Sequence, residues 1–564
     1  MAVVNINDHI NHDYDLDPNP VPKHSDFPRH FMFGVGTSAY QIEGAWNADR
    51  KGLSIWDCFA LRRPEKIFDR SNACVAVDNY ARMKEDVQLL KNMGVKHFRF
   101  SISWPRILPG GKVSMGKNME GIDHYNKLID ELLANGIEPF VTLFHWDLPN
   151  ALEEEYMGFL SSKIVDDFVN YAEICFWEFG DRVKNWLTLN EPHRFTESGY
   201  VSGMMAPGRG GDKDDGDAAT EPYIVAYNLL NCHAAAYRKY QEDYKDVQKG
   251  KVGITVDINY FKPWRGPNNA DDVKAVGYAF DFMAGWFLEP LASGEWPESM
   301  KTFATSPTPN HPKGRVLPKF SDDQRSKLIG SYDFMGINYY TATYAASYEG
   351  YYGTSPPKVP WGYTMDTHYV PLAKDPQGNF IGPPAFEGSW VYLCAKELTD
   401  LLIYVKKTYK IEKHFVITEN GANQNNVPEQ TYEQVRDDEF RLKYIKWHLK
   451  AILDANREGV NVMGYFAWSF MDSYEWFFGH TSRFGMIYVD YANNLQRYPK
   501  KSAIWFKKFL AEGHHHHGHK KRLAAKANVE QEDDDLNGTM IEADDAVEAD
   551  QPVETVQKMK KAKA

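Results

Sequence analysis

The stretch WLTLNEPHRF, residues 186–195, joins an apolar run to a carboxylate in an unusual way. Its first residues are typical of a buried strand, yet the run ends at once in Asn190 and Glu191. A second run, HFVITENG at residues 414–421, places Glu419 at the equivalent point. A buried carboxylate is costly unless it has a partner or a task, so two carboxylates in matching places require an explanation.

Eight apolar runs of this kind occur before residue 510, and segments with helical periodicity separate them. The runs are rich in Val, Ile, Phe and Leu without strict alternation, which is typical of parallel strands buried on both faces. Between two of them, residues 78–94 place Met83, Val87 and Leu90 on one face, with Asp78 as the expected N-cap. The eight runs begin at Phe31, His97, Pro139, Trp186, Val252, Tyr332, His414 and Val462.

Strand and helix alternating eight times predict an α/β protein built as a single (β/α)8 barrel, a TIM barrel, with long loops after its strands. We assign residues 25–510 to the barrel, 1–24 to an N-terminal extension and 511–564 to a charged tail. A doubly wound sheet is the competing architecture, but no Gly-rich phosphate turn follows the first strand. In barrels of this type catalytic groups project from the carboxyl ends of strands, which explains where Glu191 and Glu419 stand.

Composition excludes several classes of function. The net charge of −13 argues against nucleic-acid binding. The five cysteines have no metal-type spacing, so we expect reduced thiols and no metal or cofactor. No secretory signal and no apolar run of membrane-spanning length are visible, which predicts an intracellular protein of the nucleus or cytoplasm. The tail is too polar to bury a core and is expected to be disordered, and homo-oligomerisation stays open.

Two glutamates facing each other across a pocket suggest glycoside hydrolysis, with one carboxyl as acid and the other as nucleophile or general base. Arg99, in the second run, and Tyr340, at the end of the sixth, can reach toward Glu419 and keep it ionised, which suits a nucleophile. A desolvated, protonated Glu191 suits an acid. A separation of about 5 Å between the carboxyls would indicate retention of configuration, and a wider one inversion.

The other strand ends carry aromatic and hydrogen-bonding side chains, a mixture that fits a neutral pyranose. A phosphorylated sugar would need cations after the eighth strand, where Arg483 stands alone beside Glu475. The residues expected to bind glucose are Gln41, His145, Trp146, Asn190, Asn338, Trp468, Glu475, Trp476 and Phe484.

The motifs FRFSISW, LFHWDLP, TLNEP, NYYT and ITENG, which follow one another along the chain in this order, each at a strand end, together resemble glycoside hydrolase family 1, the β-glucosidases. The resemblance covers residues 25–510 and implies a retaining mechanism with Glu191 as acid/base and Glu419 as nucleophile. Residues 135–186 further resemble plant members that act on alkaloid and secoiridoid glucosides. The chain departs from the usual pattern at Ser473, where Asn is usual, and in the segment PHRFTESGY after Glu191.

A long loop follows the sixth strand, from about residue 341 to 390, and is expected to shape the entrance for the leaving group. By resemblance, Trp390 forms one wall of this aglycone slot, opposite His193, Phe195 and Tyr200. Such a slot predicts a bulky aglycone, with a monoterpenoid indole alkaloid glucoside such as strictosidine as the expected substrate. The alternatives are a secoiridoid glucoside, a transglucosidase, and a sugar-binding protein on an inactive barrel, which would be expected to lose one glutamate.

Overall fold

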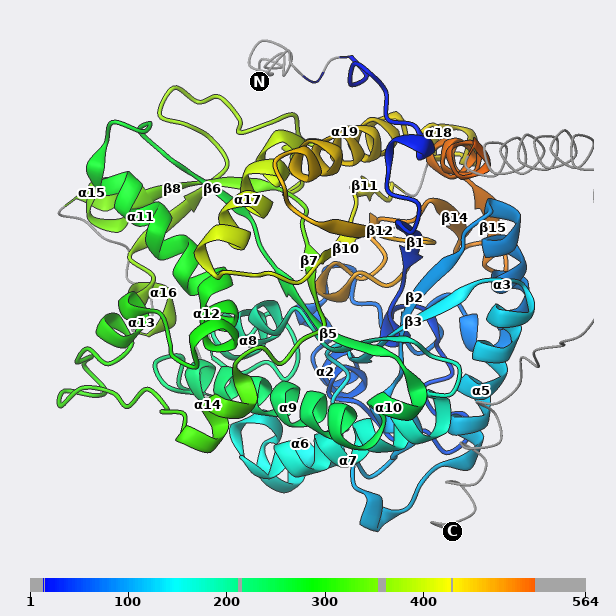
Figure 1. The fold of residues 1–564 in the computed structure, drawn as a ribbon, viewed down its shortest axis with the longest axis horizontal. Coiled ribbons are helices and arrows are strands. Elements are labelled where there is room, and N and C mark those ends of the chain that lie inside the picture. The colour runs from blue at the N-terminus through cyan, green and yellow to red at the C-terminus, as the bar shows by residue number, and fades with distance from the viewer. Residues whose placement is uncertain (1–13, 15, 211–215, 354–361, 428–429, 513–564) are drawn as a thin grey trace, which may run out of the picture.

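The computed structural model describes residues 14, 16–210, 216–353, 362–427 and 430–512. Its centre is a closed barrel of eight parallel strands in the order β1-β12-β10-β7-β5-β4-β3-β2 (Figure 1). All eight predicted strands and the barrel are confirmed, so the doubly wound alternative is wrong. The barrel strands are β1 (Met32–Gly36), β2 (His97–Ser101), β3 (Glu138–Phe144), β4 (Asn185–Asn190), β5 (Lys251–Asp257), β7 (Phe334–Asn338), β10 (Phe415–Asn420) and β12 (Val462–Ala467).

Long helices surround the barrel and cover its apolar outer face (Figure 1). The longer ones are α3 (Asn79–Met93), α5 (Met119–Ala134), α7 (Lys163–Phe179), α9 (Glu221–Asp243), α17 (Ala395–Thr408) and α19 (Glu439–Arg457). The shorter ones are α1 (Ala39–Ile42), α2 (Ile55–Arg62), α4 (Trp104–Ile107), α6 (Asn150–Tyr156), α8 (Pro192–Tyr200), α10 (Lys245–Gln248), α11 (Ala270–Phe280), α12 (Trp286–Ser293), α13 (Glu298–Phe303), α14 (Asp322–Leu328), α15 (Tyr348–Tyr352), α16 (Tyr363–Asp366) and α18 (Tyr432–Arg436).

Helix α3 shows how the periodic pattern becomes structure. Met83, Val87 and Leu90 are buried against the barrel, and Gly94 ends the helix with a φ of 77°. Asp78 stands at the N-cap position as predicted, but its φ of 56° is left-handed and its side chain makes no cap hydrogen bond. Capping needs an extended backbone, and the Asp78 carboxylate instead accepts a hydrogen bond from Arg82 Nε at 3.2 Å.

An apolar layer closes the barrel interior before the carboxyl ends of the strands. It contains Phe140, Leu187, Phe334, Val416 and Phe466, all almost fully buried. The rings of Phe140 and Phe466 pack with centroids 4.9 Å apart. A ligand can therefore enter only from the carboxyl ends of the strands.

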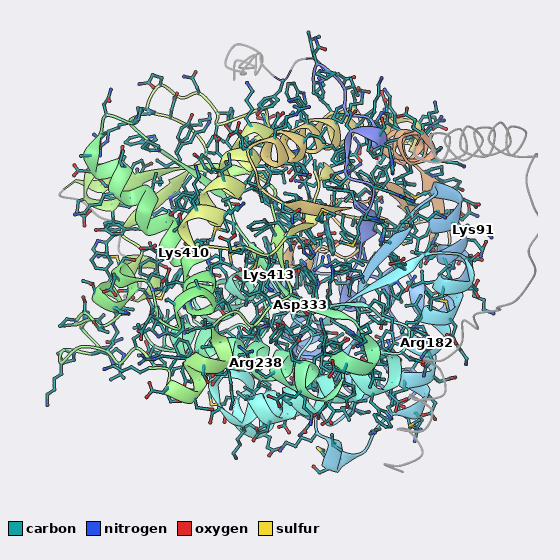
Figure 2. All side chains as sticks on the ribbon, viewed as in Figure 1. Lys91, Arg182, Arg238, Asp333, Lys410 and Lys413 are labelled. Atoms are coloured by element: carbon teal, nitrogen blue, oxygen red, sulfur yellow. The ribbon has the colours of Figure 1, made fainter. Side chains whose placement is uncertain are left out.

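The amino ends of the strands carry residues that stabilise the fold. Asp333, labelled in Figure 2, lies directly before β7 and accepts a hydrogen bond from the backbone N–H of Val252 at 2.9 Å. The same carboxylate contacts Lys245 Nζ at 3.3 Å. Charged groups at this face of a barrel are typical of structural roles rather than catalysis.

The long loop predicted after the sixth strand contains structure of its own. Strand β8 (Ala342–Ser347) pairs in parallel with β6 (Tyr260–Pro263) and antiparallel with β9 (Tyr369–Leu372), which builds a small sheet beside the barrel (Figure 1). Residues 354–361 of this loop and the predicted tail from residue 513 lie outside the described residues. Two further pairs of short strands are β11 (Gln424–Asn425) with β13 (Ser482–Arg483) and β14 (Ile487–Asp490) with β15 (Gln496–Pro499).

Among the described residues, no helix combines the length and apolar character needed to cross a membrane.

Candidate active site

A cavity of about 460 Å³ opens at the carboxyl ends of the barrel strands, where the sequence predicts the site. The two glutamates and most of the predicted sugar-binding side chains line it together. The predicted residues on its wall are His145, Trp146, Asn190, Glu191, Asn338, Tyr340, Trp390, Glu419, Trp468, Glu475, Trp476 and Phe484.

The carboxylate of Glu419 contacts the side chains of Arg99 and Tyr340. Arg99 Nη1 lies 2.5 Å from Oε1, and the Tyr340 hydroxyl donates to Oε2 at 2.7 Å. Burial raises the pKa of Glu419, and the hydrogen-bonded ion pair with Arg99 opposes that rise. The predicted partners of Glu419 are therefore both in contact with it.

Glu191 has a different environment. Its Oε1 accepts a hydrogen bond from Asn338 Nδ2 at 2.7 Å, and no cation forms an ion pair with it within the described chain. Burial raises the pKa of Glu191 well above its ordinary value, and the charges of Asp257 and Glu419 add to the rise. Of the two carboxyls, Glu191 is the one that keeps its proton, and Glu419, beside Arg99, is the one that ionises.

Three residues of the cavity wall have left-handed backbone conformations. The φ angles are 74° for Trp146, 46° for Glu191 and 56° for Trp476. Non-glycine residues adopt this region at a cost, and such residues gather at functional sites. At Glu191 the bend separates β4 from α8 and places the carboxyl at the rim of the barrel.

The amide of Asn190 joins several of these groups. Its Oδ1 accepts from Arg99 Nη2 at 2.5 Å, and its Nδ2 donates to His145 Nε2 at 3.1 Å. Burial lowers the pKa of His145 well below its ordinary value, so the ring is neutral. The His145 ring stacks with Trp468 and with Trp476, both at 5.9 Å between centroids, and Trp146 lies 4.4 Å from Trp476.

Glu475 reaches the cavity from the loop after β12. Its Oε1 accepts a hydrogen bond from Ser473 Oγ at 2.9 Å, and burial raises its pKa well above the ordinary value. Gln41, predicted to bind glucose directly, lies behind this loop and donates to the carbonyl of Tyr474 at 2.8 Å. Gln41 is fully buried and is not part of the cavity wall, and its side chain contacts the residue before Glu475.

Comparison with known proteins agrees with this geometry. The model of glycosyl hydrolase family 1 matches residues 23–515. The chain belongs to glycosyl hydrolase family 1. It is an O-glycosyl hydrolase, a retaining β-glucosidase, and the sugar-binding protein on an inactive barrel is excluded as its class.

Several family 1 proteins are similar over nearly their whole length. Raucaffricine-O-beta-D-glucosidase of Rauvolfia serpentina is 45% identical over 533 residues, covering 91% of this chain and 95% of that protein. Oleuropein beta-glucosidase of Olea europaea is 43% identical over 516 residues, covering 87% and 90%. The crystal structure of rice Os3BGlu6 β-glucosidase superposes with a TM-score of 0.80 at 43% identity, covering 86% of this chain and 98% of that chain.

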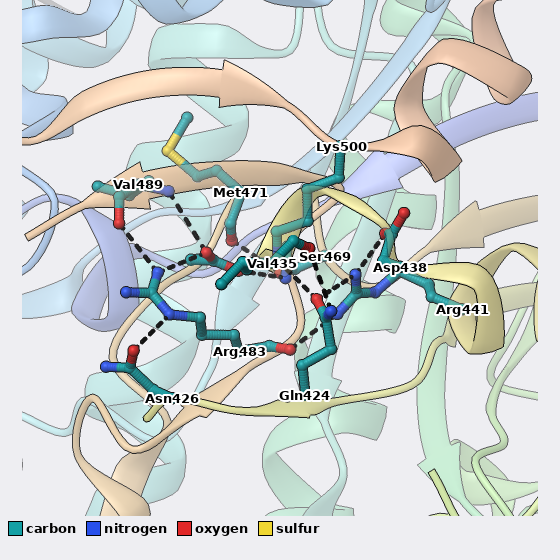
Figure 3. Close-up of polar contacts among 12 residues, drawn as sticks. Gln424, Asn426, Val435, Asp438, Arg441, Ser469, Met471, Arg483, Val489 and Lys500 are labelled. Carbon is teal, nitrogen blue, oxygen red and sulfur yellow. Dashed lines mark hydrogen bonds and ion pairs between the residues drawn. The ribbon is translucent and has the colours of Figure 1, made fainter. Parts of the chain in front are cut away.

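The loop that carries Glu475 in this family 1 enzyme is held by a buried ionic network (Figure 3). Asp472 contacts Arg483 Nη1 at 2.6 Å and Lys500 Nζ at 2.8 Å, and all three side chains are almost fully buried. Burial lowers the pKa of Lys500 to about 7. Arg483 also donates to the carbonyl of Val489 at 2.9 Å, so its guanidinium serves this network and is not aimed at a sugar phosphate.

Of the four residues predicted to line the aglycone slot, only Trp390 lies on the cavity wall. Trp390 lines the cavity mouth, 40% exposed, with its ring 5.5 Å from that of Tyr340. The expectation that His193, Phe195 and Tyr200 line the cavity is wrong. All three are buried; the ring of Phe195 packs against Phe144 at 5.3 Å between centroids, and the two ring nitrogens of His193 contact Asp257 and Tyr363.

The reason is the helical period of α8, which begins at the residue after Glu191. Positions 194, 197 and 198 share one face of the helix, and this face lines the cavity with Arg194, Glu197 and Ser198. The face of α8 that lines the cavity could have been predicted from its helical period if a helix had been predicted after Glu191. The cavity residues that sequence reasoning missed are Arg194, Glu197, Ser198, Met204, Met205, Asp257, Ile258, Met283, Phe477 and Phe478.

The fifth strand supplies two polar residues to the cavity. Asn259, two residues after the end of β5, lines it, and so does Asp257, the last residue of β5. The strand-end argument that found Glu191 and Glu419 applies equally to Asp257. It was overlooked because an aspartate inside the run VGITVDI gives no motif.

Proposed function

We propose that the chain hydrolyses β-D-glucosides by double displacement, with Glu419 as nucleophile and Glu191 as acid/base. Glu419 attacks the anomeric carbon while Glu191 protonates the glycosidic oxygen and the aglycone leaves. Glu191 then takes a proton from water, which attacks the covalent glucosyl intermediate and releases glucose with retained configuration.

The surroundings of the two carboxyls support these roles. The ion pair with Arg99 favours the ionised form of Glu419, and the desolvated site of Glu191 favours the protonated form. A mutant of rice Os3BGlu6 was solved in a covalent complex with Glc, at 43% identity to this chain. A covalent glucosyl intermediate is what the double displacement requires.

The glucose ring is assigned to the part of the cavity between Glu419 and Glu475. Its hydroxyls would meet Glu475, Asn190 and the second ring nitrogen of His145, Nδ1, which has no hydrogen-bond partner among the described residues. The indoles of Trp468 and Trp476 offer flat faces for the ring, in the manner of sugar stacking on aromatic side chains. Gln41 would act through Glu475, since it does not reach the cavity.

The proposed aglycone is a bulky plant metabolite, a monoterpenoid indole alkaloid glucoside such as strictosidine. The observation that carries this proposal is that the half-exposed Trp390 and Met204, together with the buried Met283, line the cavity. Flat and flexible apolar side chains suit a large polycyclic leaving group better than a second sugar. The relative named for raucaffricine supports an alkaloid glucoside, and the one named for oleuropein supports the alternative, a secoiridoid glucoside.

A side-by-side assay of strictosidine, a secoiridoid glucoside, cellobiose and an aryl glucoside tests the proposal. We expect the highest kcat/KM for strictosidine, and Trp390→Ala should reduce it about 10-fold or more while affecting the aryl glucoside little. Tyr351→Ala is the matched control, because Tyr351 is equally exposed at 40% and lies away from the cavity wall. A preference for cellobiose, or equal losses on all four substrates, would reject the alkaloid assignment.

A transglucosidase would use the same two glutamates and pass glucose to an acceptor other than water. Glucose release measured against glucoside formation in the presence of candidate alcohols separates the two reactions. We expect glucose release to dominate.

A further inference from the structure

Asp257 is a buried acidic residue that the proposed mechanism does not use. It ends β5, lines the cavity and is only 5% exposed. Its Oδ2 lies 3.0 Å from His193 Nδ1. Its Oδ1 is buried and has no hydrogen-bond partner within the part of the chain that the structure describes.

The neighbouring protein groups are placed so that none of them donates a hydrogen bond to Oδ1. His193 is fixed by a second contact, since its Nε2 lies 3.2 Å from the hydroxyl of Tyr363, which itself donates to the carbonyl of Phe282 at 2.9 Å. Arg194 Nε is 3.9 Å from Oδ2, too far for a hydrogen bond, and Arg194 is shared with Glu197 at 3.6 Å. Neither His193 nor Arg194 therefore makes a hydrogen bond to Oδ1.

Asp257 is nevertheless ionised. Burial acts to raise its pKa, but the charges of His193 and Arg194 and the hydrogen bond from His193 outweigh it and hold the pKa below its ordinary value. An ionised carboxylate oxygen that is buried without a donor is costly, and such groups in folded proteins call for an explanation. A donor on a bound molecule is an explanation that fits a residue of the cavity wall.

The place of Asp257 in the cavity indicates which part of the substrate meets it. The groups assigned to glucose lie around Glu419 and Glu475, whereas Asp257 lies beside Glu191 with Arg194 and Glu197 of α8. Glu191 is the group that protonates the leaving oxygen, so a neighbour on this side faces the aglycone. Besides Glu191, this part of the cavity holds the carboxyls of Asp257 and Glu197 and the guanidinium of Arg194, and His193 is in contact with Asp257.

We propose that Asp257 Oδ1 accepts a hydrogen bond from a protonated amine of the aglycone and so selects glucosides of basic aglycones. A charged N–H donor gives a hydrogen bond roughly twice as strong as a neutral one and brings Asp257 a partner of opposite charge. The inference rests on the proposed function, because it assigns the donor to the leaving group of a β-glucoside. It narrows the substrate class to aglycones that carry an ammonium group near the glycosidic oxygen.

Two aryl glucosides of nearly equal shape test this inference: 3-(aminomethyl)phenyl and 3-ethylphenyl β-D-glucoside. The ratio of their kcat/KM values at pH 7 measures the preference for the amine. We expect Asp257→Asn to lower this ratio about 10-fold to 100-fold, as the loss of a hydrogen bond between charged groups predicts. If the substitution also alters Glu191 or the folded fraction of the protein, it changes kcat/KM for both substrates to a similar extent, so this change largely cancels in the ratio.

Glu197→Gln is the matched control, since it removes the other carboxylate of this wall, which is less buried. It should keep most of the preference, and Asp257→Ser should repeat the loss with a smaller side chain. An unchanged ratio in both Asp257 variants, or an equal loss in Glu197→Gln, would overturn the inference. Failure of the proposed function is detected separately: it would appear as a higher kcat/KM of the wild-type enzyme for cellobiose than for the 3-ethylphenyl glucoside.

Discussion

Glu191 and Glu419 have identical side chains, and only their neighbours distinguish them. Arg99 lies against Glu419, whereas Glu191 receives one amide hydrogen bond from Asn338. The difference in protonation that the mechanism needs follows from this asymmetry. Sequence patterns could locate both carboxyls, but they could show neither which partner each would meet nor that Asp257 would stand beside Glu191.

The role of Glu191 predicts a dependence on the leaving group. Glu191→Ala should reduce the glycosylation rate of glucosides with poor leaving groups by about 10²–10⁴-fold, the usual contribution of general acid catalysis. Activated aryl glucosides need less protonation and should lose less. Added azide should restore turnover by replacing water in the second step, and steady-state rates for both substrate types with and without azide check this. Equal losses without rescue would reject the role.

The raised pKa of Glu191 predicts the alkaline side of the pH profile. Because Glu191 must be protonated to act as an acid, kcat/KM should fall as the pH rises through its pKa. Burial is the first cause of that raised pKa and the charge of Asp257 the second, so Asp257→Asn should move the alkaline limb to lower pH. Glu197→Gln is the control and should move it less. A limb that stays in place or moves to higher pH contradicts the assignment.

At the scale of elements, α8 and the loop after β12 show what a pattern can and cannot predict. The end of β4 was readable from composition, but the face of α8 toward the cavity depends on the helical phase that the bend at Glu191 sets. The network under Glu475 joins Asp472 to Lys500, 28 positions later in the chain. Such a pairing leaves no local signal in the sequence.

This network predicts a stability effect. Lys500→Met leaves Asp472 buried with Arg483 as its remaining cation, and the loss of one member of a buried ion pair typically costs about 3–5 kcal/mol. Lys501→Met is the matched control, because Lys501 is half exposed and its contact with Asp437 is a surface pair, worth about 0–1 kcal/mol. Denaturant unfolding of both variants measures the difference. Equal midpoints would show that the network does not anchor the loop.

At the scale of the whole molecule, the barrel was predictable because parallel strands buried on both faces leave a strong apolar pattern. The strand-end rule predicted both glutamates and most of the expected sugar-binding residues, and these side chains line one cavity. The aglycone side was predicted least well, since it is assembled from α8, the end of β5 and the loop carrying Trp390. Contacts between such distant segments depend on packing and not on local periodicity.

The central claim is that Glu419 forms the covalent bond to glucose, and trapping the intermediate tests it most directly. An activated 2-deoxy-2-fluoroglucoside should inactivate the enzyme with time and add one fluoroglucosyl group per chain. Peptide mass spectrometry should find that group on Glu419, within the peptide that contains ITENG. A label on any other residue, or turnover without a trapped intermediate under conditions where deglycosylation is slow, would contradict the account.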